Sequence, residues 1–263
     1  MNEEIVTSDG HKLHYVYSPA SSDSVGDVLL AHGITSDLDE HEGLFIKAAE
    51  YFVNRNLNVL RFDFRGHGAS SIAQEKADIS GEILDISTAS KKLKELTGKN
   101  QIVVGCSFGA VSGSQLVADA QDDMVVAFAL WNPVLDVRAT FVDPGTTWSK
   151  NSINEKSLAE LDAGVVSYLM LEDFRLGKCM VNDIRRTRLP VLLRSINVPI
   201  LAFHGDLDDI VPIDLTRKAF GERTNAELRT LVGAGHGFVD YQSQVIEETT
   251  IWMKDILMRS KLL

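Results

Sequence analysis

Cysteine is scarce in this sequence, which has only Cys106 and Cys179 among its 263 residues. The first closes an apolar run and the second lies in an irregular stretch, so a framework of disulfide bonds is not expected. A chain with so few cysteines fits a reducing compartment, and we therefore expect a cytoplasmic protein.

Long hydrophobic runs and a basic N-terminal start are missing as well. No apolar stretch approaches the roughly 18 residues that cross a bilayer. The chain begins with Met1-Asn2-Glu3-Glu4, which is acidic, whereas secretory signals begin with a basic segment. We expect neither a membrane span nor a secretory signal.

Positive charge is in deficit, because 26 Lys and Arg residues stand against 37 Asp and Glu residues, for a formal net charge of −11. This charge disfavours nucleic acids and anionic membrane surfaces as partners. A local exception is the segment 183–194, with Arg185, Arg186, Arg188 and Arg194. We interpret these arginines as solvated surface groups. A site for a carboxylate or phosphate group of a substrate is the alternative.

Short apolar runs alternate with amphipathic stretches along most of the chain. This alternation predicts an α/β protein with a mostly parallel central sheet and helices on both faces. The turn signal Asp9-Gly10 predicts an antiparallel hairpin over residues 4–18. The expected strands that follow cover residues 28–31, 58–62, 101–106, 124–131, 198–204 and 227–232. Residues 41–55, a segment from an N-cap at Ser80 to Gly98, and residues 245–257 are expected to be helical.

The most informative motif is Gly105-Cys106-Ser107-Phe108-Gly109. It lies between an expected strand and an expected helix, so the backbone must turn sharply at the serine. Glycine at both flanking positions removes side chains that would clash in such a turn. The N-terminal end of the following helix points amide hydrogens and a positive dipole toward the serine, where an oxyanion would be stabilised.

A serine hydroxyl needs a base, and the base needs a carboxylate to orient it. His236 lies in a glycine-rich loop after the last expected strand and is the candidate base. Three candidate carboxylates, Asp206, Asp208 and Asp209, crowd the loop after the preceding strand. Asp136, after the strand at 124–131, is a further possibility. The aspartate spacing matches no calcium loop and no second histidine-rich motif is present, so neither a metal nor a cofactor is expected.

Ser107, Asp208, His236 and His32 each follow the carboxyl end of an expected strand. The carboxyl ends of parallel strands meet at one edge of a sheet, where ligands of such folds bind. The sequence therefore predicts one site at that edge.

Two more segments complete a pattern that resembles a known family. An apolar strand ends in His32-Gly33, and the segment 63–70 reads Asp-Phe-Arg-Gly-His-Gly-Ala-Ser. With the Ser107 motif and the Asp and His loops, these segments resemble the serine esterases and lipases of the α/β-hydrolase superfamily. Cinnamoyl (feruloyl) esterases and monoacylglycerol lipases are the most similar. The resemblance covers residues 28–134 and 198–252.

This resemblance implies a single α/β-hydrolase domain over residues 1–263. It also implies a serine hydrolase that cleaves small carboxylic esters, with Ser107 as nucleophile, His236 as base and Asp208 as the orienting acid. The backbone N–H groups of Ile34 and Phe108 would form the oxyanion hole. A thioesterase or acyltransferase on the same scaffold, or a ligand-sensing protein, are the alternatives.

Cys106 departs from the family pattern, which often has histidine before the nucleophile, and Ala110 replaces a glycine. Residues 135–195 break the rhythm of strands and helices and lie where the superfamily carries a cap over its active site. Aromatic and other large apolar side chains of this segment are candidates for lining a substrate pocket. They are Trp148, Tyr168, Leu169, Met170 and Phe174. We expect His32 and His67 only to hydrogen-bond their own loops.

Overall fold

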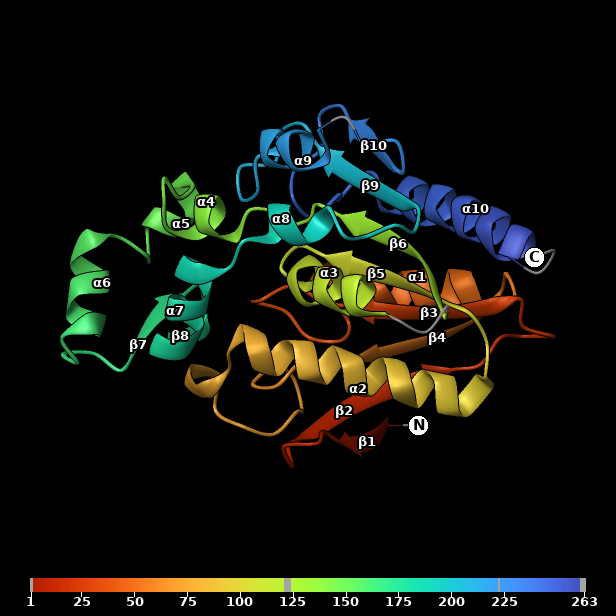
Figure 1. The fold of residues 1–263 in the computed structure, drawn as a ribbon, viewed down its shortest axis with the longest axis horizontal. Coiled ribbons are helices and arrows are strands. Elements are labelled where there is room, and N and C mark those ends of the chain that lie inside the picture. The colour runs from red at the N-terminus through yellow and green to blue at the C-terminus, as the bar shows by residue number, and fades with distance from the viewer. Residues whose placement is uncertain (1, 121–123, 222, 261–263) are drawn as a thin grey trace.

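The computed structural model describes residues 2–120, 124–221 and 223–260. Eight strands form one sheet in the order β1-β2-β4-β3-β5-β6-β9-β10 (Figure 1). Its six neighbouring strands from β4 to β10 run parallel, and β1 and β2 form an antiparallel hairpin at one edge. The bounds of the eight strands are β1 Asn2–Val6, β2 Lys12–Ser18, β3 Gly26–Ala31, β4 Leu57–Phe62, β5 Gln101–Cys106, β6 Val125–Trp131, β9 Ile200–Gly205 and β10 Ala226–Leu231. The predicted sheet and the hairpin at Asp9-Gly10 are confirmed.

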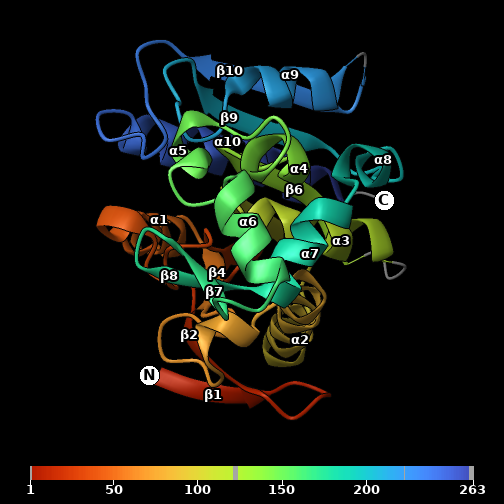
Figure 2. The same ribbon diagram turned by 90° about the vertical axis from the view of Figure 1, so that its left-hand side faces the viewer.

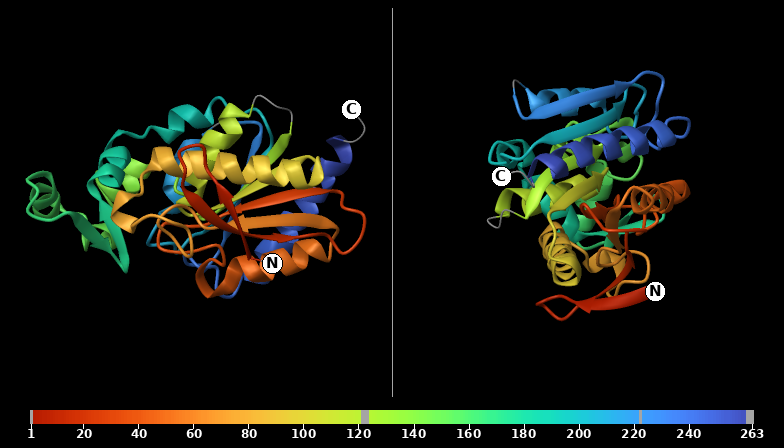
Figure 3. Two further views of the ribbon diagram at one scale, coloured as in Figure 1. Left: turned by 90° about the horizontal axis from the view of Figure 1, so that it is seen from below. Right: turned by 90° about the vertical axis from the view of Figure 1, so that its right-hand side faces the viewer.

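Helices pack on both faces of the sheet because the buried strands present apolar side chains in both directions. In β3, Val28 and Leu30 join the core under α1 and α10, whereas Leu29 and Ala31 join the core under α2 and α3. Figure 3 shows α2 on one side of the sheet and α1 and α10 on the other. These four helices cover α1 Leu44–Val53, α2 Ile79–Thr97, α3 Gly109–Asp119 and α10 Gln242–Ser260. A further helix, α9 Ile213–Phe220, joins β9 to β10.

Two helix starts differ from the sequence expectation. The segment expected to be helical from residue 41 begins as a 3-10 turn, His41–Gly43, because Glu42 and Gly43 have positive φ and interrupt the helix before α1. The N-cap of α2 is Asp78, whose side chain accepts a hydrogen bond from the Gly81 N–H, so the expected cap at Ser80 was wrong. Gly98 ends α2 in the left-handed conformation, as expected.

The segment between β6 and β9 lies beyond the carboxyl ends of the strands. Figure 2 shows its helices and a two-stranded hairpin covering that end of the sheet. The hairpin was missed in the sequence because each of its strands has only four residues. The elements are α4 Val137–Phe141, α5 Thr147–Lys150, α6 Glu155–Asp162, β7 Tyr168–Leu171, β8 Phe174–Gly177, α7 Lys178–Arg186 and α8 Leu189–Leu193. A short 3-10 helix, Gln74–Lys76, packs beside β8.

Candidate active site

Ser107 occupies the sharp turn between β5 and α3 with φ of 48°, a left-handed conformation that is rare for a residue with a side chain. The two flanking glycines explain how the chain tolerates this turn. A Cβ atom on Gly105 would lie 2.9 Å from the Ala110 Cα, and one on Gly109 would lie 2.2 Å from the Ala31 carbonyl oxygen. The strand-to-helix turn expected from the motif is therefore present, and it places the half-buried serine at the edge of the sheet.

Ser107, His236 and Asp208 come together from three separate loops. The His236 Nε2 atom is 3.0 Å from the Ser107 Oγ atom, and its Nδ1 atom is 2.7 Å from an Asp208 carboxylate oxygen. A carboxylate can only accept, so Nδ1 carries the proton that is donated to Asp208, and Nε2 is left to accept from the serine hydroxyl. This order of hydrogen bonds suits proton transfer from the serine to the imidazole.

Asp208 is a buried carboxylate with several hydrogen-bond donors. Burial alone would raise its pKa, but the side chains of His204 and His236 and the backbone N–H of Val211 hold the pKa at about 2. His204, which carried no sequence signal, is fully buried with its Nε2 atom 3.3 Å from the Asp208 carboxylate. The carboxylate therefore stays ionised wherever His236 would act as a base.

The other candidate aspartates contact different groups. Asp206 accepts a hydrogen bond from the Gly233 N–H at 2.6 Å, and Asp136 caps α4 by accepting from the Ala139 N–H. Asp209 is exposed. In the described ranges, no group of three or more His, Cys, Asp or Glu residues is arranged to hold a metal ion.

The loop after β3 lies beside the serine and its polar groups are tied in place. The His32 Nδ1 atom donates to the Gly33 carbonyl at 2.7 Å, and the His67 Nε2 atom donates to the Ile34 carbonyl at 2.6 Å. Each histidine contacts its own loop, as expected, since the His67 Nδ1 atom also lies 3.1 Å from the Arg65 carbonyl oxygen. Each also bonds the loop of a different strand, because the His32 Nε2 atom accepts from the Phe64 N–H at 3.0 Å. Within the described part of the chain, the N–H groups of Ile34 and Phe108 have no hydrogen-bond acceptor. Two free donors beside a nucleophile are what an oxyanion requires.

Asn132 links the loops that carry the three side chains. Its backbone has φ of 43°, and its side chain is buried. The side-chain oxygen accepts from the Gly205 N–H at 2.9 Å, and the side-chain amide donates to the carbonyl of His236. Trp131, the residue before Asn132, accepts a hydrogen bond from the Ser107 N–H through its backbone carbonyl at 2.9 Å. This role could not be recognised from the sequence, in which Asn132 only marks the end of an expected strand.

A cavity of about 360 Å³ opens over Ser107 and His236. Its apolar wall comes partly from the segment between β6 and β9, where Phe141 and Trp148 pack edge to face. The Trp148 Nε1 atom donates to the Glu172 carboxylate at 2.9 Å. Of the expected lining residues, Trp148 is the one that reaches this cavity. The complete lining is Gly33, Ile34, Thr35, Glu40, His41, Ser107, Val134, Phe141, Trp148, Glu172, Ile210, Val211, His236 and Gly237.

The remaining expected lining residues lie elsewhere. Leu169 and Phe174 are buried within the core of the segment, and Met170 is exposed. Phe174 also stacks on the His67 ring, with ring centroids 4.5 Å apart. Large apolar side chains of the segment therefore pack mainly against one another. This packing could not be predicted, because the segment has no clear hydrophobic period in its sequence.

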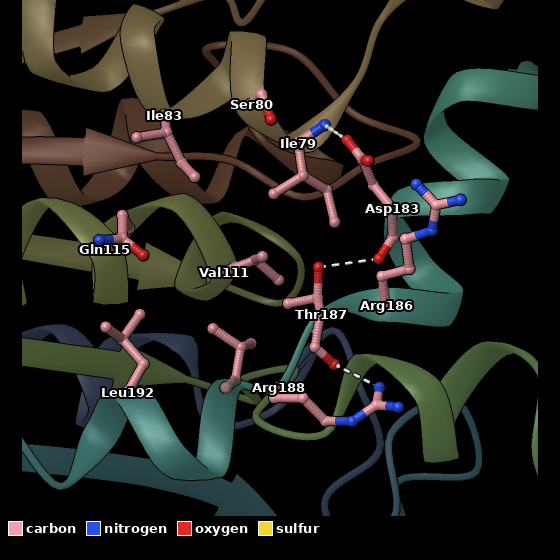
Figure 4. Close-up of a pocket in the computed structure, with 11 residues that line it drawn as sticks. Ile79, Ser80, Ile83, Val111, Gln115, Asp183, Arg186, Thr187, Arg188 and Leu192 are labelled. Atoms are coloured by element: carbon pink, nitrogen blue, oxygen red, sulfur yellow. Dashed lines mark hydrogen bonds between the residues drawn. The ribbon is translucent and has the colours of Figure 1, made fainter.

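A second cavity, of about 290 Å³, lies between α2, α3 and the α7–α8 turn, and it does not include Ser107 or His236. Figure 4 shows Ile79 and Val111 on its aliphatic floor and Arg186 and Arg188 among the residues that line its rim. Arg185 pairs with Asp162, and Arg194 is exposed. These contacts agree with the interpretation of the four arginines as surface groups.

The parallel sheet, the strained serine turn and the converging loops define the class of this protein as an α/β hydrolase. The model of the family described as serine aminopeptidase, S33, matches residues 22–168, and the chain belongs to this hydrolase family.

Solved structures share the fold over nearly the whole chain. Est1E from Butyrivibrio proteoclasticus with ferulic acid bound is 20% identical with a TM-score of 0.81, and covers 98% of this chain and 99% of its own. An esterase from Pyrococcus furiosus is 23% identical with a TM-score of 0.69, and covers 98% of this chain and 90% of its own. The human alpha/beta hydrolase domain-containing protein 17B is 22% identical over 92% of this chain and 70% of its own length. The predicted α/β-hydrolase fold is confirmed by these matches.

No helix in the described residues has the length and apolar character needed to cross a membrane.

Proposed function

We propose that this protein hydrolyses small carboxylic esters through an acyl-enzyme, with Ser107 as nucleophile, His236 as general base and Asp208 as the acid that orients it. The observation that carries the proposal is the pair of hydrogen bonds made by His236, one to Ser107 and one to Asp208. They supply the two conditions for an activated serine, a base within reach and a fixed tautomer of that base.

In the first step, His236 takes the Ser107 proton as the serine oxygen attacks the ester carbonyl. The carbonyl oxygen becomes negative and accepts hydrogen bonds from the N–H groups of Ile34 and Phe108. The imidazolium then gives its proton to the departing alcohol, and the acyl group stays on Ser107. Water attacks this acyl-enzyme with His236 again acting as base, and the carboxylic acid leaves.

The structural neighbours favour ester hydrolysis over other acyl transfers, and the shape of the cavity indicates the kind of acyl group. Several solved proteins of this fold are named esterases, including those from Pyrococcus furiosus and Exiguobacterium antarcticum. The cavity is small and its wall is largely apolar, which suits a short or aromatic acyl group.

We propose that residues 135–195 act as a cap within a single domain spanning 1–263. Phe141, Trp148 and Glu172 of this segment line the Ser107 cavity, so the segment would shape the substrate pocket and limit the entry of water. A cytoplasmic location is part of the proposal, and it is supported by two cysteines that are both free.

The test is a screen of the purified protein against acetyl, butyryl and longer acyl esters, hydroxycinnamate esters, monoacylglycerols, acyl thioesters and aminoacyl arylamides. We expect turnover of the short or aromatic esters, together with covalent labelling by a fluorophosphonate. Ser107→Ala should abolish both while melting at the wild-type temperature. Turnover that persists in the folded Ser107→Ala protein would contradict the assignment, and preferential cleavage of arylamides or thioesters would redirect it.

A further inference from the structure

Glu40 has a backbone conformation that is nearly confined to glycine, with φ of 57° and ψ of 163°. Its side chain is only 3% exposed and lines the Ser107 cavity. Strained backbone of this kind persists only where the surroundings enforce it, and it concentrates at functional sites. Neither the sequence motifs nor the three side chains of the proposed mechanism account for it.

The Glu40 carboxylate accepts hydrogen bonds from two backbone N–H groups near the serine. One oxygen accepts from the Gly33 N–H at 2.7 Å, and the other accepts from the His41 N–H at 3.0 Å. Burial, followed by the charge of this carboxylate, raises the pKa of the Cys106 thiol well above its usual range. The cysteine that departs from the family pattern therefore stays a neutral thiol.

Gly33 is wedged between Glu40 and the serine. A Cβ atom on Gly33 would lie 3.3 Å from the Ser107 Cβ atom and 3.6 Å from the carboxylate of Glu40. The bond from the Gly33 N–H to Glu40 therefore fixes the backbone immediately before the Ile34 N–H. The carbonyls of Gly33 and Ile34 are held by His32 and His67, and Glu40 holds the Gly33 N–H of the same short loop.

We propose that Glu40 is a positioning residue that aims the Ile34 N–H at the oxyanion, an inference that rests on the proposed function. Glu40 does not touch the substrate carbonyl in this account. It acts through Gly33, and its strained backbone is the consequence of bringing a carboxylate into this position from the following loop. A hydrogen bond to a carboxylate is stronger than one to a neutral acceptor, which suits a tie that must hold during turnover.

The negative charge of Glu40 has an opposite effect on the reaction, and this makes the proposal testable. A carboxylate near a developing oxyanion raises its energy by Coulomb repulsion. If that repulsion outweighed positioning, Glu40→Gln would react faster than the wild-type protein. If positioning prevails, Glu40→Gln should be somewhat slower. The amide oxygen of Gln can still accept from the Gly33 N–H, but its NH₂ group cannot accept from the His41 N–H, so that second bond is lost.

The experiment compares Glu40→Gln, Glu40→Ala and Glu40→Gly with the wild-type protein, and uses Glu42→Ala as the matched control. Glu42 also has positive φ, but it is exposed and outside the cavity. We expect Ala and Gly at position 40 to lower kcat for a short p-nitrophenyl ester by about 10- to 100-fold with KM within about threefold. This loss is smaller than the roughly 10²- to 10³-fold loss on complete removal of one oxyanion donor, because the Ile34 N–H remains present but is less well aimed. Glu40→Gln should retain most of the rate, and Glu42→Ala should match the wild type.

A second measurement follows the oxyanion directly. A trifluoromethyl ketone forms a hemiketal oxyanion on an activated serine, whereas the matching methyl ketone binds mainly as the ketone. The inhibition constant of the trifluoromethyl ketone should rise in Glu40→Ala by the same factor as kcat/KM falls, and that of the methyl ketone should not change. Glu40→Gly should melt above Glu40→Ala, because glycine relieves the strained backbone.

Three results would overturn the inference. They are folded Ala and Gly variants with wild-type kcat and trifluoromethyl ketone affinity, a loss confined to KM, and a Glu40→Gln protein faster than wild type. If Glu40→Ala and Glu40→Gly fail to fold, the rate of Glu40→Gln and its inhibition constants for the trifluoromethyl and methyl ketones still test the positioning role of Glu40. A wild-type protein that turns over no ester and binds both ketones equally would instead refute the proposed function, and this inference with it.

Discussion

The side-chain amide of Asn132 donates a hydrogen bond to the backbone carbonyl of His236, while its oxygen accepts from the N–H of Gly205. One buried side chain thus connects the strand beside the serine to the loop of the proposed base and to the strand end that precedes Asp208. The positions of the reacting groups depend on this connection as well as on their own contacts.

Asn132→Asp should lower kcat by about 100-fold, the order of loss that follows from a displacement of about 1 Å in an active site. The carboxylate can still accept from the Gly205 N–H, but it repels the His236 carbonyl to which the amide donates. Steady-state kinetics on a short ester would measure the effect. Asn154→Asp is the control, since Asn154 caps α6 and does not line the Ser107 cavity, and Asp caps helices equally well. Equal rates in the two variants would show that Asn132 does not hold the base.

Asp208→Asn should lower kcat by about 10⁴-fold while the fold is retained. The amide can donate to the His236 Nδ1 atom, which favours the tautomer in which Nε2 carries the proton and cannot accept one from Ser107. The pH dependence of the residual rate and the rate of fluorophosphonate labelling would measure the change. Asp206→Asn and Asp209→Asn are the matched controls, and a comparable loss in either of them would move the proposed acid to that position.

Trp148→Ala should shift the preference of the enzyme toward longer acyl groups. The indole forms part of the cavity wall and is held by Phe141 and Glu172, so its removal extends the cavity where an acyl chain would run. The ratio of kcat/KM for octanoyl and acetyl esters should rise by about tenfold or more, since each buried CH₂ contributes about 0.8 kcal/mol. Tyr168→Ala, in the same segment but outside the cavity, should leave the ratio unchanged. An unaltered ratio in Trp148→Ala would mean that the acyl group lies elsewhere.

Glu82→Gln should stabilise the protein at pH 8 and leave its stability at pH 4 nearly unchanged. Glu82 is buried in α2, and neither of its carboxyl oxygens has a hydrogen-bond partner in the described structure. Burial, followed by the nearby carboxylates of Asp85 and Asp78, raises its pKa well above the usual value. The unfolded chain releases this proton above about pH 4.5 and the folded protein keeps it, so stability falls as the pH rises.

Thermal melting at the two pH values measures this difference. Glu95→Gln, on the exposed surface of the same helix, is the control and should show no such dependence on pH. A Glu82→Gln protein that is less stable than wild type at pH 8 would indicate that Glu82 is ionised and paired in the folded state.

Local signals explain what could be predicted from the sequence. Glycines on both sides of Ser107 are required by atoms within a few ångströms, so the turn could be recognised from five residues. The positions of the central strands along the chain could be predicted from apolar runs that are buried throughout, as in β3 and β5. His236 and Asp208 follow strand ends, and parallel strands bring their loops to one edge.

Long-range polar contacts explain what was missed. Glu40 is one of several acidic residues in a polar stretch, and only the fold brings its carboxylate to Gly33. Asn132 is distinguished by bonds to residues more than 70 positions away. The N-cap of α2 was misplaced by two residues, because Asp78 and Ser80 are both good caps and sequence alone does not choose between them.

The stacked rings of His67 and Phe174 join the β7–β8 hairpin to the backbone of Ile34, since the same imidazole holds the Ile34 carbonyl. A bulky ester that pushes this hairpin outward would also tilt the peptide that follows Ile34. Such an ester could bind well and still react slowly. In this protein, discrimination against oversized substrates should therefore be found in turnover rather than in affinity.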